Sequence, residues 1–267
     1  MTGDLSFWKM EGAGNDFVVV DARDGLPCPP DELARRLCAR GTGIGADGLL
    51  ALTDARPGRA VVDYRNADGS SAAFCGNGAR CAARFAVERG LSGSPLELVF
   101  PGFTVQAEVC GPTVAIRAAR PTIDEAPLSL PLPDGGSLPG RLVRAGVPHV
   151  VAREPAGARL SLPALAERLF AARPELAGAV NVTLVREASD RTLFVRTFER
   201  GSGETLACGS GAWAAAAFCE TPPGAGGRFE VFPPAGIPLT VELAPAGGGA
   251  LLSGPARVVF RGLLAEW

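Results

Sequence analysis

Apolar, often β-branched residues cluster in short stretches of the chain, and this pattern predicts a fold rich in strands. Residues 17–20, 60–64 and 96–100 fit it, and residues 103–118 alternate between apolar and polar positions. Residues 31–40 follow two prolines and open on an acidic residue, which predicts a helix. The first part of the chain is therefore expected to mix strands and helices.

The second part of the chain repeats this mixture. A helix is expected near residues 161–172, and another, built of small residues, is expected after Cys208. Further strands are expected near residues 180–186, 192–198, 228–232, 238–243 and 256–261.

A proline- and turn-rich stretch from Pro121 to Pro139 lies between the two parts and indicates a domain junction or a long exposed connection. The chain has 267 residues, 47% of them hydrophobic, which suffices for one large or two medium domains. We predict two similar domains of mixed α/β class, residues 1–113 and 114–254. The last strand, in residues 255–267, is expected to return to the first domain.

The most informative feature is an internal repeat. Residues 75–85 (CGNGARCAARF) and 208–218 (CGSGAWAAAAF) agree at 7 of 11 positions without a gap, and they lie 133 residues apart. This offset is half the chain length, so two domains of one design are expected. Each would place Cys-Gly-x-Gly-Ala where a loop becomes an alanine-rich helix.

A cysteine directly before a helix lies beside backbone N–H groups and the positive end of the helix dipole, and both favour the thiolate. The same N-terminus can bind a carboxylate, and the glycines leave room for a ligand. If two such helices served one ligand, the carbon next to its carboxylate would lie between two thiols. One thiolate could remove a proton from one face while the other thiol protonates the opposite face, which inverts the stereocentre. The repeat favours this interpretation for Cys75 and Cys208.

Simpler interpretations apply to other motifs. The segment from Gly43 to Gly48 fits Gly-x-Gly-x-x-Gly, but it follows a predicted helix rather than a strand. A structural or substrate-facing loop is therefore favoured over a dinucleotide site. The remaining five cysteines are expected to be buried as small apolar side chains. They are Cys28, Cys38, Cys81, Cys110 and Cys219.

Scarce residue types exclude several kinds of site. His149 is the only histidine, so one chain cannot build a metal centre with several imidazoles. Lys9 is the only lysine and a poor candidate for a pyridoxal phosphate Schiff base. Seven cysteines without a Cys-x-x-Cys pair favour reduced thiols over a zinc ribbon. We therefore expect neither a metal nor an organic cofactor.

Charge and hydropathy limit the partners. The net charge is −2, with acids and bases mixed along the chain, so no nucleic acid is expected as a partner. The apolar run at residues 212–219 is far shorter than the roughly 20 residues that span a bilayer. The N-terminus lacks the apolar core of a signal peptide. We expect no membrane contact and a cytoplasmic location.

Five segments together carry a resemblance to a known family. They are FWKMEGAGNDFVVVD (7–21), GIGADGLL (43–50), NADGSSAAFCGNGARCAARF (66–85), GVPHVV (146–151) and ERGSGETLACGSGA (199–212). In this order they resemble the diaminopimelate epimerase family, and the two cysteine blocks are the most specific. The resemblance implies a cofactor-independent epimerase that interconverts LL- and meso-2,6-diaminopimelate, on the route to lysine and the peptidoglycan precursor. It also implies a homodimer, two domains with a mainly antiparallel sheet around a central helix, and an active site between the domains.

The resemblance also assigns roles at the reacting carbon. Cys75 and Cys208 would be the two acid/base residues, and His149 and Glu199 would tune their pKa values. Asn15, together with Glu199, would bind the charged groups of the reacting centre. The reacting carboxylate would be held by the backbone at the two helix N-termini, which comprise Gly76, Asn77, Gly209 and Ser210.

At the far end of the substrate, the resemblance points to Asn66, Asn181 and Arg200, with Arg200 suited to a bidentate carboxylate clamp. Each of these side chains also has a simpler interpretation. The asparagines, Asn15 included, could cap turns, and Arg200 could form an ordinary surface ion pair. His149 could be a packed histidine after Pro148.

At four positions this sequence departs from the family pattern: Gly48, Ser71, Val147 and Trp213. Gly48 and Val147 replace polar residues, so no substrate contact is expected there, and Trp213 could belong to the core or to a dimer surface. Two rival functions remain. A proline or hydroxyproline racemase would share the two-thiol chemistry without the distal clamp, and a non-catalytic amino-acid-binding protein would tolerate loss of either thiol.

Overall fold

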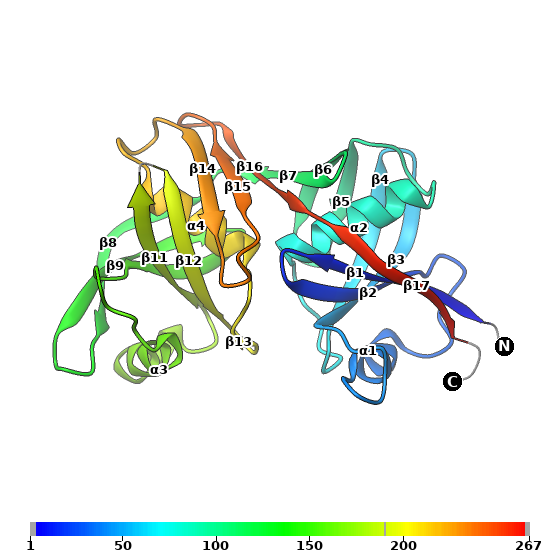
Figure 1. Ribbon diagram of the computed structural model, residues 1–267, viewed down its shortest axis with the longest axis horizontal. Helices are drawn as coiled ribbons and strands as arrows, with labels where there is room; N and C mark the ends of the chain where they lie inside the picture. Colours follow the sequence, from blue (N-terminus) through cyan, green and yellow to red (C-terminus); the bar gives the residue numbers. More distant parts are fainter. Residues whose placement is uncertain (1–3, 190, 265–267) are drawn as a thin grey trace. The chain divides into compact units, whose positions relative to one another are not determined.

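The computed structural model describes residues 4–189 and 191–264 and divides into two compact units (Figure 1). One unit is Met1–Arg117 with Ser253–Trp267, and the other is Ala118–Leu252. Both units combine strands with two α-helices, so the predicted mixed α/β class is confirmed. Each unit is described by itself below.

The first unit is a curved sheet with one helix inside it and one outside. Its strands are paired in the order β17-β1-β2-β3-β4-β5-β6-β7. Pairs β2–β3 and β4–β5 are parallel, and the other described pairs in this unit are antiparallel. The elements are β1 (Leu5–Gly12), β2 (Asn15–Asp21), α1 (Pro30–Cys38), β3 (Gly48–Arg56), β4 (Arg59–Asn66), α2 (Gly76–Glu88), β5 (Leu96–Val99), β6 (Thr104–Cys110), β7 (Thr113–Ala119) and β17 (Arg257–Leu264).

The second unit has a closely similar plan. Its strands are paired in the order β8-β9-β10-β11-β12-β14-β15, with β10–β11 and β12–β14 parallel. The elements are β8 (Thr122–Pro131), β9 (Ser137–Ala145), β10 (Val147–Arg153), α3 (Leu162–Ala172), the 3-10 turn η1 (Pro174–Leu176), β11 (Asn181–Ser189), β12 (Thr192–Glu199), β13 (Gly203–Glu204), α4 (Gly209–Cys219), β14 (Gly227–Phe232), β15 (Leu239–Leu243) and β16 (Gly249–Pro255).

The two units repeat one connectivity. In each, a hairpin leads by an outer helix to a parallel strand, and a second hairpin leads by an inner helix to another. The repeat extends to the register, because β3–β4 and β11–β12 both carry an irregularity toward the same end of the hairpin. The duplication inferred from the cysteine motifs therefore holds for the strand order of both units.

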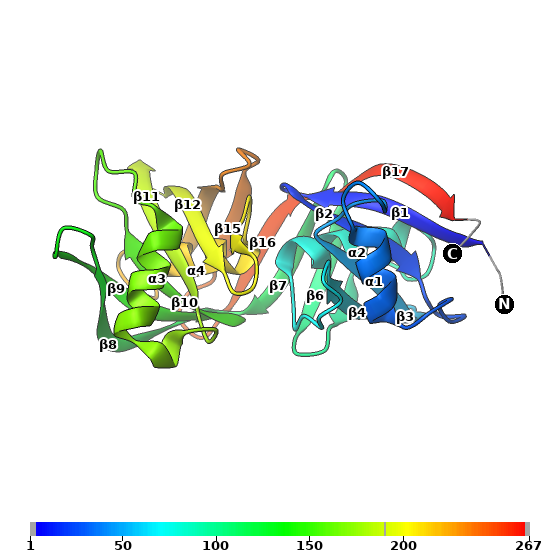
Figure 2. The same cartoon turned by 90° about the horizontal axis from the view of Figure 1, so that it is seen from below.

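The inner helices are the most buried elements, because strands surround them on several sides (Figure 1). α2 contacts five strands of its unit, and residues 76–86 along it are buried. α4 is apolar on all sides and buried from Gly209 to Ala217, as an enclosed helix must be. By contrast, α1 and α3 bury one face each on their own sheets and leave the other in solvent (Figure 2).

One expectation about the chain between Pro121 and Pro139 is wrong. Instead of an exposed connection, the structure has the hairpin β8–β9, whose strands pair from Thr122–Arg144 to Pro131–Ser137. Leu130 and Leu138 are buried in the core of the second unit, together with residues of α3. The register shifts between Ile123 and Pro127, and Pro131 and Pro139 lie within the regular part of the pairing. No helix in the part of the chain that the structure describes is long and apolar enough to cross a membrane.

Candidate active site

Each repeated cysteine caps an inner helix. Cys75 precedes α2 and Cys208 precedes α4, and both have extended backbones, with φ/ψ of −141°/120° and −132°/113°. In each case the thiol sulfur accepts a hydrogen bond at 3.4 Å from the N–H three residues later, that of Gly78 or Gly211. The thiols thus occupy the place of an N-cap side chain, where the helix N–H groups and dipole favour negative charge.

The second glycine of each motif is explained by packing. A Cβ atom at Gly211 would lie 2.4 Å from Thr197 Oγ1, which leaves no room for one. At Gly78 the nearest atoms would be side-chain carbons of Leu50 and Phe17, at 3.3 and 3.4 Å. The space beside these glycines is therefore filled by the protein's own side chains, not left open for a ligand as the sequence suggested.

In the first unit, Asn15 and Asn77 form a chain of amides beside Cys75. Asn77 Nδ2 donates to Asn15 Oδ1, and Asn15 Nδ2 donates to Asp47 Oδ2 at 3.0 Å. At the other end, Arg80 Nη2 donates to Asn77 Oδ1 at 2.8 Å. A cation and a carboxylate therefore fix the orientation of both amides.

The hydrogen bonds described for Asn66 go to Ser70 and not to the amides of Asn15 and Asn77. Asn66 ends β4, and its side chain donates to Ser70 Oγ at 3.0 Å, while its N–H donates to the Ser70 carbonyl. This is the turn-capping role that was the simpler alternative for Asn66. Its predicted part in substrate binding stays a prediction.

The second unit brings together its predicted residues around His149. The imidazole is fully buried on β10, where Nε2 lies 2.9 Å from Ser210 Oγ and Nδ1 lies 2.9 Å from Thr183 Oγ1. Ser210 Oγ lies in turn 3.4 Å from Cys208 Sγ, and Thr183 Oγ1 lies 3.2 Å from Thr197 Oγ1. A continuous line of polar groups therefore runs from the thiol into the core.

Asn181 joins this line to Arg200. Asn181 Nδ2 lies 3.5 Å from His149 Nε2, and Asn181 Oδ1 accepts from both the backbone N–H and Nε of Arg200, at 3.1 and 3.3 Å. Arg200 Nη1 also donates to the Ala179 carbonyl. Arg200 is thus oriented by an amide and a carbonyl, and the described part of the chain shows no carboxylate paired with it, contrary to a surface ion pair.

Glu199 ends β12, directly before Arg200. Its carboxylate accepts a hydrogen bond from Thr205 Oγ1 at 2.6 Å, and its charge acts on Cys208. Cys208 itself is buried, and burial raises the pKa of its thiol well above the usual range, with the Glu199 charge adding to the shift. Hydrogen bonds from Ser210 and Gly211 oppose the rise without overcoming it.

The electrostatics of Cys208 correct one sequence expectation. A helix N-terminus contributes ~0.3–1 kcal/mol in favour of an anion, whereas full burial shifts a pKa by up to ~3–5 units the other way. Burial therefore decides, and Cys208 is a thiol at neutral pH. Burial, followed by the charge of Arg200, also lowers the pKa of His149 to about 3, so its imidazole is neutral.

The other cysteines divide between core and surface. Cys38, Cys81 and Cys219 are buried as expected, and burial raises the pKa of Cys38 to about 12 and that of Cys219 to about 11. Cys28 is half-buried and packs against the core of the first unit, whereas Cys110 is exposed, so the prediction of burial is wrong for Cys110. Cys110 is the last residue of β6, directly before the exposed turn to β7.

Two of the four positions that depart from the family pattern, Gly48 and Trp213, have structural explanations. A Cβ at Gly48 would lie 2.6 Å from the Arg65 carbonyl and 2.7 Å from the Tyr64 ring, so no side chain fits there. Trp213 is 1% exposed and belongs to the core of its unit. The segment Gly43 to Gly48 leads from α1 into β3, not from a strand into a helix, and lacks the context of a dinucleotide site.

Several residues that build these arrangements were not predicted. Asp47 and Arg80 lie inside quoted motifs, and a comparison of Arg80 with its counterpart Trp213 could have singled it out. Thr183 and Thr197 carry no motif. The one signal for them is a polar residue among apolar ones, Thr183 in the run NVTLV of β11 and Thr197 in the neighbouring strand β12.

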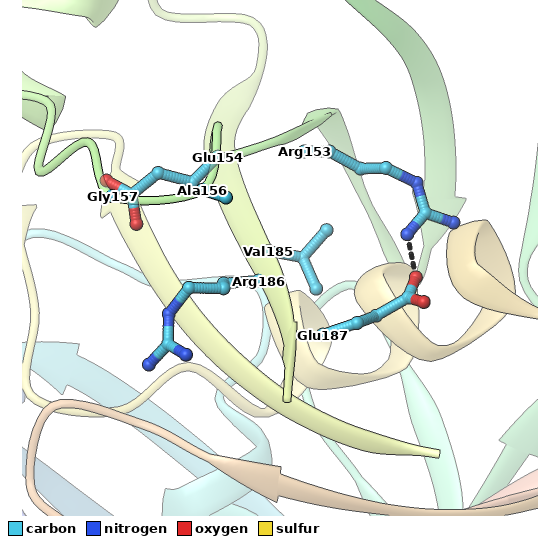
Figure 3. A pocket seen from close by; sticks show the side chains of 7 residues that line it. All are labelled: Arg153, Glu154, Ala156, Gly157, Val185, Arg186 and Glu187. Carbon is cyan, nitrogen blue, oxygen red and sulfur yellow. Dashed lines mark hydrogen bonds and ion pairs between the residues drawn. The ribbon is translucent and has the colours of Figure 1, made fainter. Parts of the chain in front are cut away.

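Apart from these residues, the second unit has a surface pocket of about 370 Å³ (Figure 3). It lies where β10 and β11 end, and an ion pair between Arg153 and Glu187 crosses it. None of the predicted site residues lines it. Among residues 4–189 and 191–264, no group of histidine, cysteine or acidic side chains is arranged to hold a metal ion.

The fold of the chain is shared by solved structures of low sequence identity. A probable proline racemase from Agrobacterium radiobacter superposes with a TM-score of 0.74 at 17% identity, covering 97% of this chain and 92% of that one. A hydroxyproline epimerase from Agrobacterium vitis gives 0.71 at 16% identity, covering 98% and 92%. These likenesses concern the fold.

Sequence comparison identifies the family. The sequence profile of diaminopimelate epimerase matches residues 7–120 and 141–259, and the chain belongs to the diaminopimelate epimerase family. The diaminopimelate epimerase of Aquifex aeolicus is 33% identical, over 98% of both chains, and that of Xylella fastidiosa is 38% identical, over 97% of this chain and 96% of its own. The O-ureido-serine racemase of Streptomyces lavendulae is also 38% identical, over 97% and 94%. The protein is therefore an isomerase of the epimerase type that acts on a small molecule.

Proposed function

We propose that this protein interconverts LL- and meso-2,6-diaminopimelate without a cofactor, with Cys75 and Cys208 as the two acid/base groups. In this role it would serve lysine and peptidoglycan-precursor biosynthesis in the cytoplasm, as a homodimer. The observation that carries the proposal is the matched pair of thiols. Each caps the buried inner helix of its unit with the same backbone geometry and the same 3.4 Å hydrogen bond.

The proposed reaction moves two protons. One thiolate takes the α-proton from one face of the substrate carbon, and the electron pair is delocalised into the neighbouring carboxylate. The opposite thiol then delivers its proton to the other face, so the stereocentre is inverted and the two sulfurs exchange protonation states. Backbone N–H groups of Gly76, Asn77, Gly209 and Ser210 would stabilise the developing charge on the carboxylate.

The residues of the second unit support recognition of a second charged end. Asn181 accepts hydrogen bonds from the backbone N–H and Nε of Arg200, which orients the guanidinium for contact with a carboxylate. Asn66 would add a polar contact from the first unit, and Asn15 and Glu199 would bind the groups at the reacting centre. His149 would act on Cys208 through Ser210.

A second candidate is a racemase for an acyclic amino acid with an uncharged polar side chain. Its support is the O-ureido-serine racemase, which is as similar in sequence as some of the epimerases. The two candidates differ at the distal end of the substrate, because a ureido group offers no carboxylate to Arg200. A proline or hydroxyproline racemase is less well supported, since those relatives share the fold at 16–17% identity.

The test is proton NMR of LL-diaminopimelate with the reduced protein in D2O and no added cofactor. Loss of the α-proton signal with formation of the meso isomer supports the proposal. Parallel reactions contain O-ureido-L-serine, L-proline and trans-4-hydroxy-L-proline. If the α-proton exchanges in one of these reactions and not with diaminopimelate, the amino acid in that reaction is the substrate. Binding of amino acids without exchange in any sample would favour the non-catalytic binding protein.

Variants at Arg200 test the clamp. Arg200→Ala is expected to raise KM for diaminopimelate by about 10²-fold, because a charge-assisted bidentate contact is lost. Arg200→Lys should recover part of this through its charge, and Arg23→Ala, whose residue pairs with Asp21 at the surface, is the matched control. Unchanged KM in Arg200→Ala would contradict the substrate assignment.

A further inference from the structure

Arg80 is a fully buried arginine on α2, the helix that begins after Cys75. Its guanidinium donates to three oxygens, the Pro255 carbonyl at 3.1 Å, the Gly76 carbonyl at 3.5 Å and Asn77 Oδ1 at 2.8 Å. All three acceptors are uncharged. Within residues 4–189 and 191–264, no carboxylate forms an ion pair with it, although buried arginines are normally paired.

The guanidinium lies at the first turn of α2, because it donates to the Gly76 carbonyl and to Asn77 Oδ1, and these two residues follow the N-cap Cys75. Burial lowers the pKa of Arg80, whereas thiolates at Cys81 and Cys75 and the carboxylate of Glu11 would raise it. Cys81 is fully buried, and burial raises the pKa of its thiol so far that it stays protonated. Cys75 is half-buried at the helix N-terminus and accepts the Gly78 N–H. Cys75 is therefore the thiol that can supply the missing anion.

The second unit has a different side chain at the position that matches Arg80. The repeat aligns Arg80 with Trp213, a fully buried indole on α4. Beside Cys208 the structure instead has the neutral His149 linked through Ser210, and the like charge of Glu199. Ser210 Oγ lies 3.4 Å from Cys208 Sγ and 2.9 Å from His149 Nε2, so its hydroxyl joins the thiol to the neutral imidazole.

We propose that Arg80 is a positioning residue that supplies a permanent positive charge to Cys75, so that in the resting protein Cys75 is the thiolate and Cys208 the thiol. The proposal deepens the two-thiol function proposed above and rests on it for its catalytic meaning. Arg80 also holds Asn77, so it sets the orientation of the amide chain to Asn15.

Other ionisable groups on the elements around α2 do not provide the same charge. On β1, Glu11 bonds to Arg257 and Lys9 bonds to Asp16 of β2, so these charges are compensated in pairs. Tyr64 of β4 packs edge-on against Phe17. Further ion pairs lie on α2 and its neighbouring strands: Arg84 with Glu88 on α2, Arg59 with Glu97 between β4 and β5, and Arg65 with Asp63 on β4.

The proposal is tested by alkylation of the full-length reduced protein with iodoacetamide between pH 5.5 and 9.5. The thiolate sulfur attacks the methylene carbon and iodide leaves, and mass spectrometry quantifies the product at Cys75 and at Cys208. The pH midpoint reports ionisation, whereas the plateau rate at high pH reports access. We expect the midpoint of Cys75 to lie at least one pH unit below that of Cys208, about a tenfold difference in thiolate fraction.

Variants separate the charge of Arg80 from its hydrogen bond. Arg80→Gln can still donate to Asn77 Oδ1 but is neutral, so alkylation of Cys75 at pH 7 should slow about tenfold while the plateau rate is kept. Arg80→Lys keeps the charge and should stay within about twofold of the wild type. Arg84→Gln is the matched control, because Arg84 lies four residues further along α2 and is already paired with Glu88.

Two results would overturn the proposal. One is a lower midpoint for Cys208 than for Cys75 in the wild type, and the other is an unchanged Cys75 midpoint in a folded Arg80→Gln protein. If Arg80→Gln does not unfold cooperatively, the wild-type midpoints and Arg80→Lys still decide. Alkylation needs no substrate, so failure to turn over diaminopimelate would leave these midpoints, and this inference about the charges, to be judged separately.

Discussion

The strands that support the two thiol-capped helices differ in the chemistry of their side chains. Behind α2, the equivalent strands present apolar and aromatic side chains, and behind α4 they present hydrogen-bonding ones. Leu50 pairs with Tyr64 across β3 and β4, as Thr183 pairs with Thr197 across β11 and β12. The two sets are Phe17, Leu50 and Tyr64 in the first unit, and His149, Thr183 and Thr197 in the second.

This difference shows how one backbone plan can hold two unlike thiols. In the proposal above, the charge beside Cys75 comes from Arg80, which lies on the helix itself. Behind α4, hydrogen-bonding groups reach Cys208 instead: His149 contacts Ser210, and Ser210 contacts the thiol. The units therefore share their helix caps and differ in the means that set protonation.

Removal of either thiol is expected to have the largest effect on activity. Cys75→Ser and Cys208→Ser are each expected to lower the rate of epimerisation by about 10³-fold or more, because a hydroxyl is far less acidic than a thiol. Because the hydroxyl still fits the cap position, each protein should remain folded. The measurement is the initial rate of meso formation from the LL isomer, with circular dichroism as a check of the fold.

Cys110→Ser is the control for both thiol variants, since Cys110 is exposed and outside both helix caps. Its rate should match the wild type. A rate within tenfold of the wild type for either active-site variant would argue against two-base catalysis. Equal and complete losses would indicate that both units contribute to each turnover.

The second test replaces His149 by phenylalanine, the residue type of Phe17 at the matching position, and measures how stability depends on pH. His149 has its pKa lowered to about 3 in the folded chain, below the usual value of 6.5. Between these values the unfolded state binds the extra proton, so stability falls as the pH drops. The loss attributable to His149 is roughly 3 kcal/mol between pH 6.5 and 4, and none of it should remain in His149→Phe.

The measurement is urea unfolding of wild type and His149→Phe at several pH values. Carboxylates such as Asp16, whose pKa is lowered in the fold, also cost stability in acid, but they act equally in both proteins. His149→Phe should be less stable at pH 7, because Ser210 and Thr183 lose their partner, and yet depend less on pH. Parallel pH dependences in the two proteins would contradict a neutral buried imidazole.

The paired glycines give a third comparison. Gly211→Ala is expected to lower the free energy of unfolding by about 1–3 kcal/mol, because its Cβ would lie 2.4 Å from Thr197 Oγ1. Gly78→Ala meets only side-chain carbons at 3.3 Å or more and gains helix propensity, so its change should be within about 1 kcal/mol. Thermal and urea unfolding check both, and equal effects would show that the strands behind the two helices are equally adaptable.

Much of the fold is predictable from the sequence, because its signals are local. The cysteine motif indicates both inner helices, since Cys-Gly-x-Gly followed by alanines encodes a cap and a buried helix. The hairpin β8–β9 was missed because its prolines suggest a turn, whereas Pro131 and Pro139 pair within it. Strand propensity is a property of single residues, whereas this pairing depends on the partner strand, so propensity alone does not reveal it.

The site is less predictable, because its chemistry depends on how far each side chain is buried. The motif correctly locates Cys208 at a helix N-terminus, but only burial beside Glu199 explains why its thiol is protonated. The line from His149 through Thr183 to Thr197 joins three separate strands, and no spacing in the sequence reveals it. Arg80 is the exception, since its mismatch with Trp213 is visible in the repeat itself.

Trp213, the counterpart of Arg80, gives the smallest expected effect. Its indole is buried, and Nε1 has no acceptor among the residues that the structure describes. Trp213→Phe removes this unsatisfied donor, worth about 1–3 kcal/mol, but also removes packing, and the two nearly cancel. We therefore expect the free energy of unfolding to change by less than about 1 kcal/mol. Trp8→Phe, which disturbs contacts with Phe85 and Arg261 without that relief, should cost more in the same urea titration, and the reverse order would show that the indole N–H of Trp213 is satisfied after all.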